Sequence, residues 1–170
     1  MERFGRPVLQ VLKAIPMLTL EPVLAALALL AATAVQAAPD RVCGRWLTED
    51  KQGTVQVYFE ADGKLAGRIV AGSGPNERDD KNPDPAQRGR PLLGLKLMQG
   101  FSRDGDGWRG GEIYDPDEGK TYQATARLSD KDANRLLLRG YVGVPMFGRT
   151  EEWTREPAPA GDPCRDPGAG

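Results

Sequence analysis

The sequence predicts an all-β domain: an eight-stranded antiparallel up-and-down barrel with one long loop and a single helical turn. Three observations favour this fold. The 170 residues include 21 Gly and 14 Pro, so turns are many and long helices are few. Short apolar segments alternate with turn-forming clusters at a spacing of roughly 8–12 residues. These segments are numerous enough for an antiparallel sheet to close on itself.

The first 37 residues have the features of a cleaved signal peptide. Three basic side chains within the first 13 residues precede an uncharged apolar run from Val23 to Val35. That run is shorter than the roughly 20 residues needed to span a bilayer, and small residues lead up to Ala37. We expect translation to start at Met1 or Met17 and the product to be periplasmic or secreted, with no stable membrane anchor. An uncleaved anchor is the alternative.

The mature domain is predicted to span residues 38–156, and its charge is nearly balanced. The chain after the leader carries 20 basic and 22 acidic side chains, because three of the 23 Lys+Arg and two of the 24 Asp+Glu lie in the leader. This balance argues against a dedicated nucleic-acid-binding protein, which needs a basic face. The sequence has no His, which excludes a Ser-His-Asp triad, a Cys-His pair and a His-ligated metal. We predict no catalytic residue, no metal site and no cofactor.

Two cysteines lie at opposite ends of the mature chain: Cys43 near its start, and Cys164 in a Pro/Gly-rich tail over residues 157–170. In an oxidising compartment, an isolated pair of this kind predicts a disulfide. Two unpaired thiols are the alternative, because the tail is expected to be mostly disordered except where Cys164 attaches it.

The first half of the domain contains four predicted strands. Their ranges are Gly44–Thr48, Thr54–Glu60, Lys64–Ala71 and Leu93–Phe101. In the second strand Val55 and Val57 share one face, and in the third strand Leu65, Gly67 and Ile69 do so. This two-residue period is typical of strands with one buried and one solvent-facing side.

The second half of the domain contains four more predicted strands. Their ranges are Trp108–Tyr114, Thr121–Leu128, Arg135–Val144 and Gly148–Arg155. Alternation places Ala124 and Ala126 on the inward face of one strand, and Val142 and Val144 on the inward face of the next. We expect the small inward residues Gly67, Ala124 and Ala126 to leave part of the barrel interior unfilled.

One long polar segment, Gly72–Pro91, interrupts the pattern. Twenty residues without apolar periodicity are usually functional or disordered, and Pro83–Arg88 is expected to form one helical turn. We hypothesise that this loop covers the open barrel end and places Arg88 and Arg90 at the rim, where they grip a carboxylate or phosphate head group. The alternative is a disordered loop whose arginines pair with nearby aspartates. Those aspartates are Asp79, Asp80 and Asp84.

A tryptophan, Trp46, lies on the first predicted strand. In closed eight-stranded barrels such a side chain can plug the floor, with an Arg of the last strand stacked on it. Arg149 and Arg155 are the two candidates for that contact. An ordinary core tryptophan fits the residues equally well.

Two apparent motifs are better explained by turns. Gly105–Gly110 matches a dinucleotide-binding pattern, but that site requires a helix N-terminus and the following residues are typical of a strand. The acidic residues around Asp104 and Asp115 do not follow the spacing of a calcium loop. Aspartate is common in turns because its side chain bonds to its own backbone.

A series of motifs in order carries a family resemblance. They are Gly44–Asp50, Asp80–Pro85, Arg90–Gly94, Ile113–Pro116, Gly119–Tyr122, Leu138–Gly143 and Gly148–Thr150. From Gly44 to about Arg155 the chain resembles the bacterial exported family known as domain of unknown function 2147. The resemblance implies a lipocalin-like β-barrel and no established activity or catalytic residue. It also implies a cysteine pair in the hairpin where this chain has Ala61 and Ala66, a pair that Cys43 and Cys164 would replace.

The predicted function is the binding of a small apolar or amphipathic molecule inside the barrel. The candidate ligand-binding residues are Trp46, Arg88, Arg90, Tyr114, Tyr122 and Arg149. The alternative is an interaction or structural module of the envelope whose barrel is filled by its own side chains. An enzyme is not expected, since without His it would need carboxylates, Tyr or Lys as acid and base. The sequence carries no information on oligomeric state.

Overall fold

The computed structural model describes residues 40–72, 77–157, 159–161 and 163–168. The predicted signal peptide and its cleavage site lie outside these residues. In the described part of the chain, no helix has the length and apolar character required to cross a membrane.

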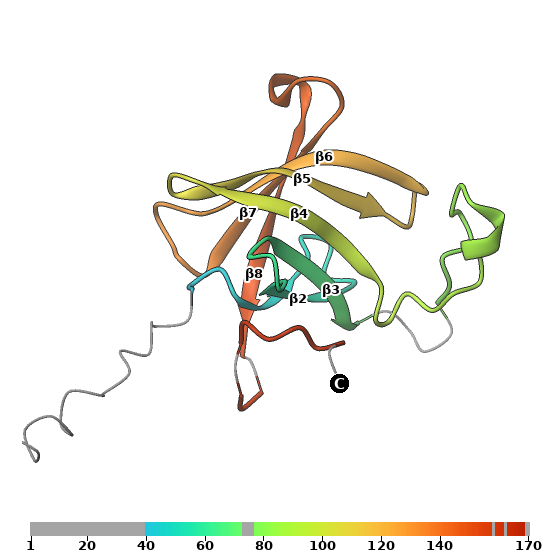
Figure 1. Ribbon diagram of the computed structural model, residues 1–170, viewed down its shortest axis with the longest axis horizontal. Helices are drawn as coiled ribbons and strands as arrows, with labels where there is room; N and C mark the ends of the chain where they lie inside the picture. Colours follow the sequence, from blue (N-terminus) through green and yellow to red (C-terminus); the bar gives the residue numbers. More distant parts are fainter. Residues whose placement is uncertain (1–39, 73–76, 158, 162, 169–170) are drawn as a thin grey trace, which may run out of the picture. The chain divides into compact units, whose positions relative to one another are not determined.

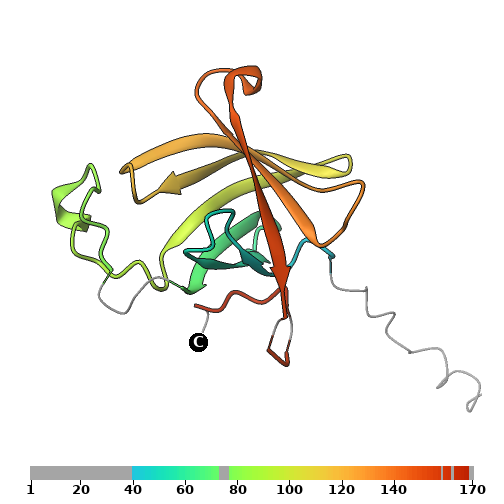
Figure 2. The ribbon, with the colours of Figure 1, turned by 180° about the vertical axis from the view of Figure 1, so that it is seen from behind.

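The described chain forms a closed barrel of eight antiparallel strands, as predicted. Each strand pairs with the next, and β8 returns to pair with β1, so the sheet has no free edge. The strands are β1 (Gly44–Leu47), β2 (Thr54–Phe59), β3 (Leu65–Ala71), β4 (Lys96–Asp104), β5 (Gly107–Asp115), β6 (Lys120–Leu128), β7 (Arg135–Tyr141) and β8 (Arg149–Glu156). Figures 1 and 2 show the barrel from two opposite sides.

Two short 3-10 helices lie outside the sheet: η1 (Pro85–Gln87) in the long loop and η2 (Pro145–Phe147) between β7 and β8. The first confirms the predicted helical turn. Asp84 caps it, since its side chain accepts a hydrogen bond from the Ala86 N–H at 2.9 Å. Figure 1 shows both segments extending away from the strands.

The end of β7 differs from its prediction. The strand stops at Tyr141, and Val142 and Val144, expected to point inward, are 74% and 49% exposed. Gly143 adopts a positive φ of 77°, which ends the extended backbone, and η2 then turns the chain back toward β8. The apolar pattern of this segment therefore belongs to a projecting turn and not to the core.

One half of the barrel interior, around Met98 and Phe101, is filled by large side chains that pack against glycines. A Cβ atom at Gly67 would lie 2.9 Å from the Met98 sulfur and 3.0 Å from a Val55 methyl carbon. A Cβ at Gly111 would overlap the ring of Phe101. The space expected beside Gly67 is thus already occupied.

The same correction applies to the two inward alanines. Ala124 and Ala126 are buried, and both belong to the main apolar core. Trp108 lies opposite Ala126 in the strand register and is itself almost fully buried. The small residues accommodate neighbouring aromatic rings and leave no void there.

The disulfide between Cys43 and Cys164 is present, as predicted, and it joins residues 121 positions apart. The described part of the tail also contacts β2 and β3. The Gln56 side-chain amide donates to the Pro163 carbonyl at 2.6 Å, and Arg68 lies 3.4 Å from Asp166. The tail is therefore attached through other residues as well as Cys164, whereas the sequence predicted attachment through that cysteine alone.

Candidate functional site

The floor of the barrel is closed by Trp46. This residue is fully buried, and its indole N–H donates to the Val42 carbonyl at 2.9 Å. The Arg155 guanidinium carbon lies 4.1 Å from the centre of the Trp46 ring. The predicted stacking of an arginine on Trp46 is confirmed, and Arg155 is the residue that provides it.

The guanidinium of Arg155 is also bound to backbone. It donates to the Cys43 carbonyl at 3.0 Å and to the Arg41 carbonyl. Gly44 makes this position possible, since its φ is +130° and a Cβ there would lie 2.9 Å from the guanidinium. Burial lowers the pKa of Arg155, as does the charge of Arg41, and the stacking and carbonyl contacts offset the desolvation.

A cavity of about 1050 Å³ opens at the other end of the barrel. Its size is at the upper limit of small-molecule sites, which typically measure about 300–1,000 Å³. The apolar part of its wall is formed by Val55, Ile69, Leu92, Leu97, Ile113, Leu138 and Trp153. Trp46 does not line this cavity, so the ligand contact expected for it gives way to a role in closing the floor.

Strand β8 passes from the cavity to the floor. Its side chains alternate, so that Arg149, Glu151, Trp153 and Arg155 share one face. Arg149, Glu151 and Trp153 line the cavity, and Arg155 covers Trp46 below it. No register shift interrupts β8, so its two arginines lie on one face at opposite ends of the barrel.

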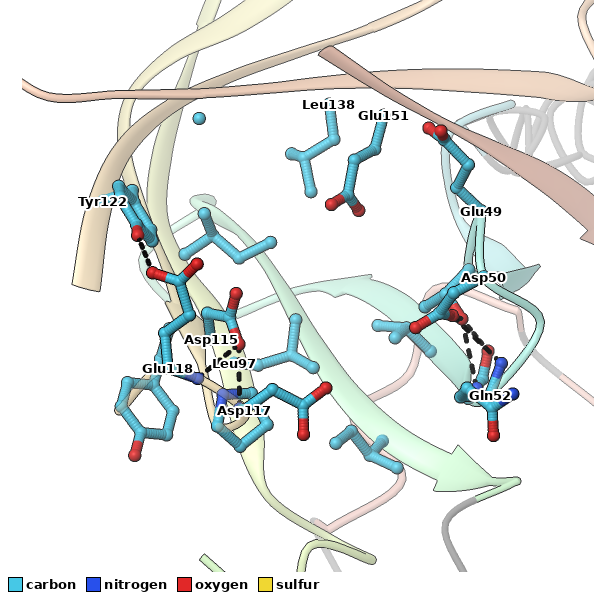
Figure 3. Close-up of a pocket in the computed structure, with 18 of the residues that line it drawn as sticks. Glu49, Asp50, Gln52, Leu97, Asp115, Asp117, Glu118, Tyr122, Leu138 and Glu151 are labelled. Carbon is cyan, nitrogen blue, oxygen red and sulfur yellow. Dashed lines mark hydrogen bonds between the residues drawn. The ribbon is translucent and has the colours of Figure 1, made fainter. Parts of the chain in front are cut away.

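Glu151 brings a carboxylate into this cavity. Figure 3 shows its side chain beside that of Leu138, both directed into the open space. Its hydrogen-bond partner is the Trp153 indole N–H, which donates at 3.0 Å. Within the described part of the chain, no Lys or Arg forms an ion pair with Glu151.

Acidic side chains dominate the lining of the cavity and its mouth. They are Glu49, Asp50, Glu77, Asp80, Asp115, Asp117, Glu118 and Glu151. The basic side chains in the lining are Arg78 and Arg149. Arg149 lies 3.7 Å from the Glu49 carboxylate and is largely exposed, so its charge is already paired with an acid.

Several mouth carboxylates have local structural partners. Asp50 accepts hydrogen bonds from Thr48 at 2.6 Å and from the Gln52 N–H at 3.0 Å. Asp115 accepts from the N–H groups of Asp117 and Glu118 in the β5–β6 turn. These contacts are typical of aspartates in turns, as the sequence suggested. Figure 3 shows them on two sides of the cavity.

Tyr122 lines the cavity, and its hydroxyl donates to Glu118. This hydrogen bond, burial and the Glu118 charge raise the pKa of Tyr122 to about 12. The same hydrogen bond, together with Lys120, lowers the pKa of Glu118. The pair therefore keeps a protonated phenol next to a carboxylate at the mouth.

The long loop is held by a buried carboxylate, Asp79. This fully buried side chain accepts hydrogen bonds from Tyr114 at 2.5 Å, from Asn82 at 2.7 Å and from Arg90 at 2.8 Å. Burial raises the pKa of Asp79, but the three hydrogen bonds outweigh it and hold the pKa below its usual value. Since Tyr114 belongs to β5, Asp79 anchors the loop to the barrel wall.

The two loop arginines do not lie where the ligand hypothesis placed them. Arg88 donates to the Asn82 carbonyl at 2.7 Å, and Arg90 is engaged by Asp79 and by the Gln87 side chain. Neither arginine lines the cavity. Arg90 instead follows the alternative interpretation, in which it pairs with an aspartate of its own loop.

Of the six predicted ligand-binding residues, Tyr114, Tyr122 and Arg149 line the cavity. Glu151 was not among the predicted residues. It lies two residues from Arg149 and two from Trp153, so strand alternation puts all three on one face and could have identified an inward carboxylate.

Comparison with known proteins agrees with this architecture. The family model described as "Uncharacterized protein conserved in bacteria (DUF2147)" matches residues 44–155. The solved structure of protein HP1028 from Helicobacter pylori, described as belonging to the lipocalin family, aligns with a TM-score of 0.60 and 22% identity. That alignment covers 68% of this chain and 82% of the other, and it shows a shared fold. No curated protein sequence matches this chain.

Proposed function

Since this chain belongs to the DUF2147 family of bacterial proteins and has a lipocalin-like barrel, we propose that it is an exported protein that binds a small apolar or amphipathic molecule inside that barrel. The observation that carries the proposal is the cavity of about 1050 Å³. Its wall combines apolar side chains with a few convergent polar groups, the usual composition of a ligand site.

The alternative function, an envelope module with a filled barrel, requires a packed interior. The half of the barrel near Trp46 meets that requirement, with Met98 and Phe101 filling the space over glycines. The half near Glu151 does not meet it, because the cavity extends between the strands there. The hollow half favours ligand binding over a purely structural role.

Export is supported by two features of the chain. The disulfide between Cys43 and Cys164 is the kind of bond that persists in oxidising compartments. The first 37 residues have the composition of a signal peptide. We therefore place the protein in the periplasm or outside the cell.

Binding is proposed here in preference to catalysis. Without His, acid–base chemistry would fall to carboxylates and tyrosines. At the mouth, Asp50 and Asp115 accept hydrogen bonds within their own turns, and Glu118 is bonded to Tyr122. These contacts support structural roles for the polar groups that an enzyme would require.

The test uses Gly140, a cavity-lining residue of β7. A Cβ at this position would lie 3.6 Å from the Tyr122 Cβ and 3.8 Å from an Ile113 methyl carbon, which is ordinary contact. Gly140→Leu should therefore place its larger side chain in the cavity, and Gly140→Ala is the matched control. The probe is the neutral apolar dye N-phenylnaphthylamine, whose fluorescence rises when it enters an apolar site.

We expect the wild type and Gly140→Ala to bind the dye, and Gly140→Leu to weaken that binding by about tenfold or more through steric exclusion. Thermal unfolding of each variant shows whether the fold is intact. Absence of dye binding to the wild type, or equal binding to a folded Gly140→Leu, would contradict binding in the barrel.

A further inference from the structure

The carboxylate of Glu151 differs in its surroundings from the other acids that line the cavity. It points into the cavity from near the start of β8, and the indole N–H of Trp153 is its hydrogen-bond donor. Six of the eight cavity acids are exposed; the two that are partly buried are Glu151 and Asp115, and Asp115 accepts hydrogen bonds from the N–H groups of its own turn. In the described chain, Glu151 has no cationic partner.

A carboxylate in such a place favours a positively charged ligand. Its neighbours Leu138 and Trp153 are buried and apolar, so the charge faces a wall that solvates it poorly. One indole N–H satisfies a small part of the hydrogen-bonding capacity of two carboxylate oxygens. A ligand ammonium would supply both the missing charge and further donors.

The surrounding charge has the same sign. Eight acidic and two basic side chains line the cavity and its mouth, and one of those two, Arg149, is paired with Glu49. A cleft lined by one sign of charge raises the local concentration of oppositely charged ligands and lowers that of like-charged ones. This arrangement disfavours the carboxylate or phosphate head group expected from the sequence.

The cavity also offers apolar surface beside this carboxylate. Trp153 is almost fully buried and holds Glu151 at the wall through its indole N–H. Ile69, Leu92 and Leu97 each expose a small part of their side chains in the same cavity. A molecule with one ammonium group and a hydrocarbon body matches both parts of this lining.

We propose that the ligand of this barrel is an amphipathic cation, whose ammonium group pairs with Glu151 while its hydrocarbon body lies against the apolar wall. This inference rests on the proposed ligand-binding function and adds the chemical class of the ligand. Glu151 is its specificity-determining residue. The carboxylates at the mouth contribute attraction at longer range.

The experiment compares three straight-chain probes of equal length: decylammonium, decanol and decanoate. Binding to the full mature protein is measured by isothermal titration calorimetry at low and at high salt. We expect decylammonium to bind about tenfold or more tightly than decanol, as a charge-assisted hydrogen bond provides, and decanoate to bind most weakly. Added salt should reduce the difference between decylammonium and decanoate.

Two variants assign the preference to its residue. Glu151→Gln keeps the shape of the side chain, and it should remove the advantage of decylammonium over decanol while leaving decanol binding unchanged. Glu112→Gln is the matched control, because Glu112 is an exposed residue of β5 that does not line the cavity. It removes the same charge and should preserve the preference.

The outcomes separate this inference from the proposed function. Decanoate binding as tightly as decylammonium, or a preference that survives in Glu151→Gln, overturns the cationic ligand and leaves ligand binding intact. Failure of all three probes to bind the wild type overturns ligand binding itself, and the cationic ligand with it.

Discussion

The two ends of the barrel are built by the same strands but treat polar groups in opposite ways. At the floor, the half-buried Arg155 guanidinium lies on Trp46 and donates to two backbone carbonyls. At the mouth, Glu151 projects into a cavity with one indole N–H as its hydrogen-bond partner. The Arg155 guanidinium is satisfied within the protein, whereas the Glu151 carboxylate keeps hydrogen-bonding capacity, as the proposed ligand binding requires.

Strand β8 makes the comparison direct, because both charges lie on its inward face. Arg155 and Glu151 are separated by Trp153 on that face. Their difference arises from the neighbouring strands: Gly44 leaves room for the guanidinium, and the chain before β1 supplies the carbonyls. An inward charge is thus structural or functional according to what surrounds it.

The largest expected effect is loss of the disulfide that fastens the floor. Closing a loop of 121 residues contributes about 4–5 kcal/mol to the free energy of unfolding in the chain-entropy model. The double variant Cys43→Ser, Cys164→Ser should lose about that much stability in urea denaturation. A reducing agent added to the wild type should have the same effect, and an unchanged midpoint in reductant would contradict the role of this bond.

The next effect is the removal of the floor residue itself. Trp46→Ala should lower the free energy of unfolding by about 3–5 kcal/mol, because it leaves a cavity in a packed region and removes the surface under Arg155. Phe147→Ala is the control at the mouth, since Phe147 is 80% exposed, and it should change stability by less than about 0.5 kcal/mol. Similar losses for the two variants would remove the distinction between the ends.

A smaller effect concerns the tyrosines near the mouth at alkaline pH. Burial and the Asp79 carboxylate raise the pKa of Tyr114 to about 12, against 10.0 for an unperturbed tyrosine. The folded state therefore holds this proton more tightly than the unfolded state. The stabilisation is complete below pH 10 and is lost as the pH rises toward 12, and Tyr122 acts in the same direction.

Urea denaturation from pH 9 to 12 measures this loss. The double variant Tyr114→Phe, Tyr122→Phe removes both phenols and should show a shallower decline of stability with pH than the wild type. Equal slopes for the two proteins would show that the tyrosines do not have raised pKa values in the folded state.

Most of the barrel was predictable because its physical cause is local. Alternation put Val55 and Val57 on one face of their strand and Leu65 and Ile69 on one face of the next, and all four are buried. Where alternation continued past a strand, as at Val142, the prediction was wrong, because Gly143 turns the chain before the next pair forms.

The site was less predictable because its decisive contacts are between distant segments. Arg90 pairs with Asp79 because Asp79 is buried against Tyr114, and these two residues are 35 positions apart in the sequence. The position of the cavity depended on how Met98 and Phe101 filled the space over glycines in the other half of the barrel. Periodicity predicts which face of a strand a side chain is on. It does not predict how side chains from different strands fill the interior, or which residues of neighbouring strands pair.

The smallest expected effect is the sharpest comparison of the two ends, since it makes the same kind of change twice on one strand. Glu151→Gln should alter the free energy of unfolding by less than about 0.5–1 kcal/mol, because the carboxylate has no cationic partner to lose and the amide can still accept from Trp153. Arg155→Gln should cost about 2–3 kcal/mol, because it leaves two carbonyls and the Trp46 ring without their partner. Urea denaturation of both variants measures the contrast. A loss for Glu151→Gln as large as that for Arg155→Gln would mean that Glu151 serves the fold, and the contrast between a satisfied Arg155 and a Glu151 that is free to bind a ligand would no longer hold.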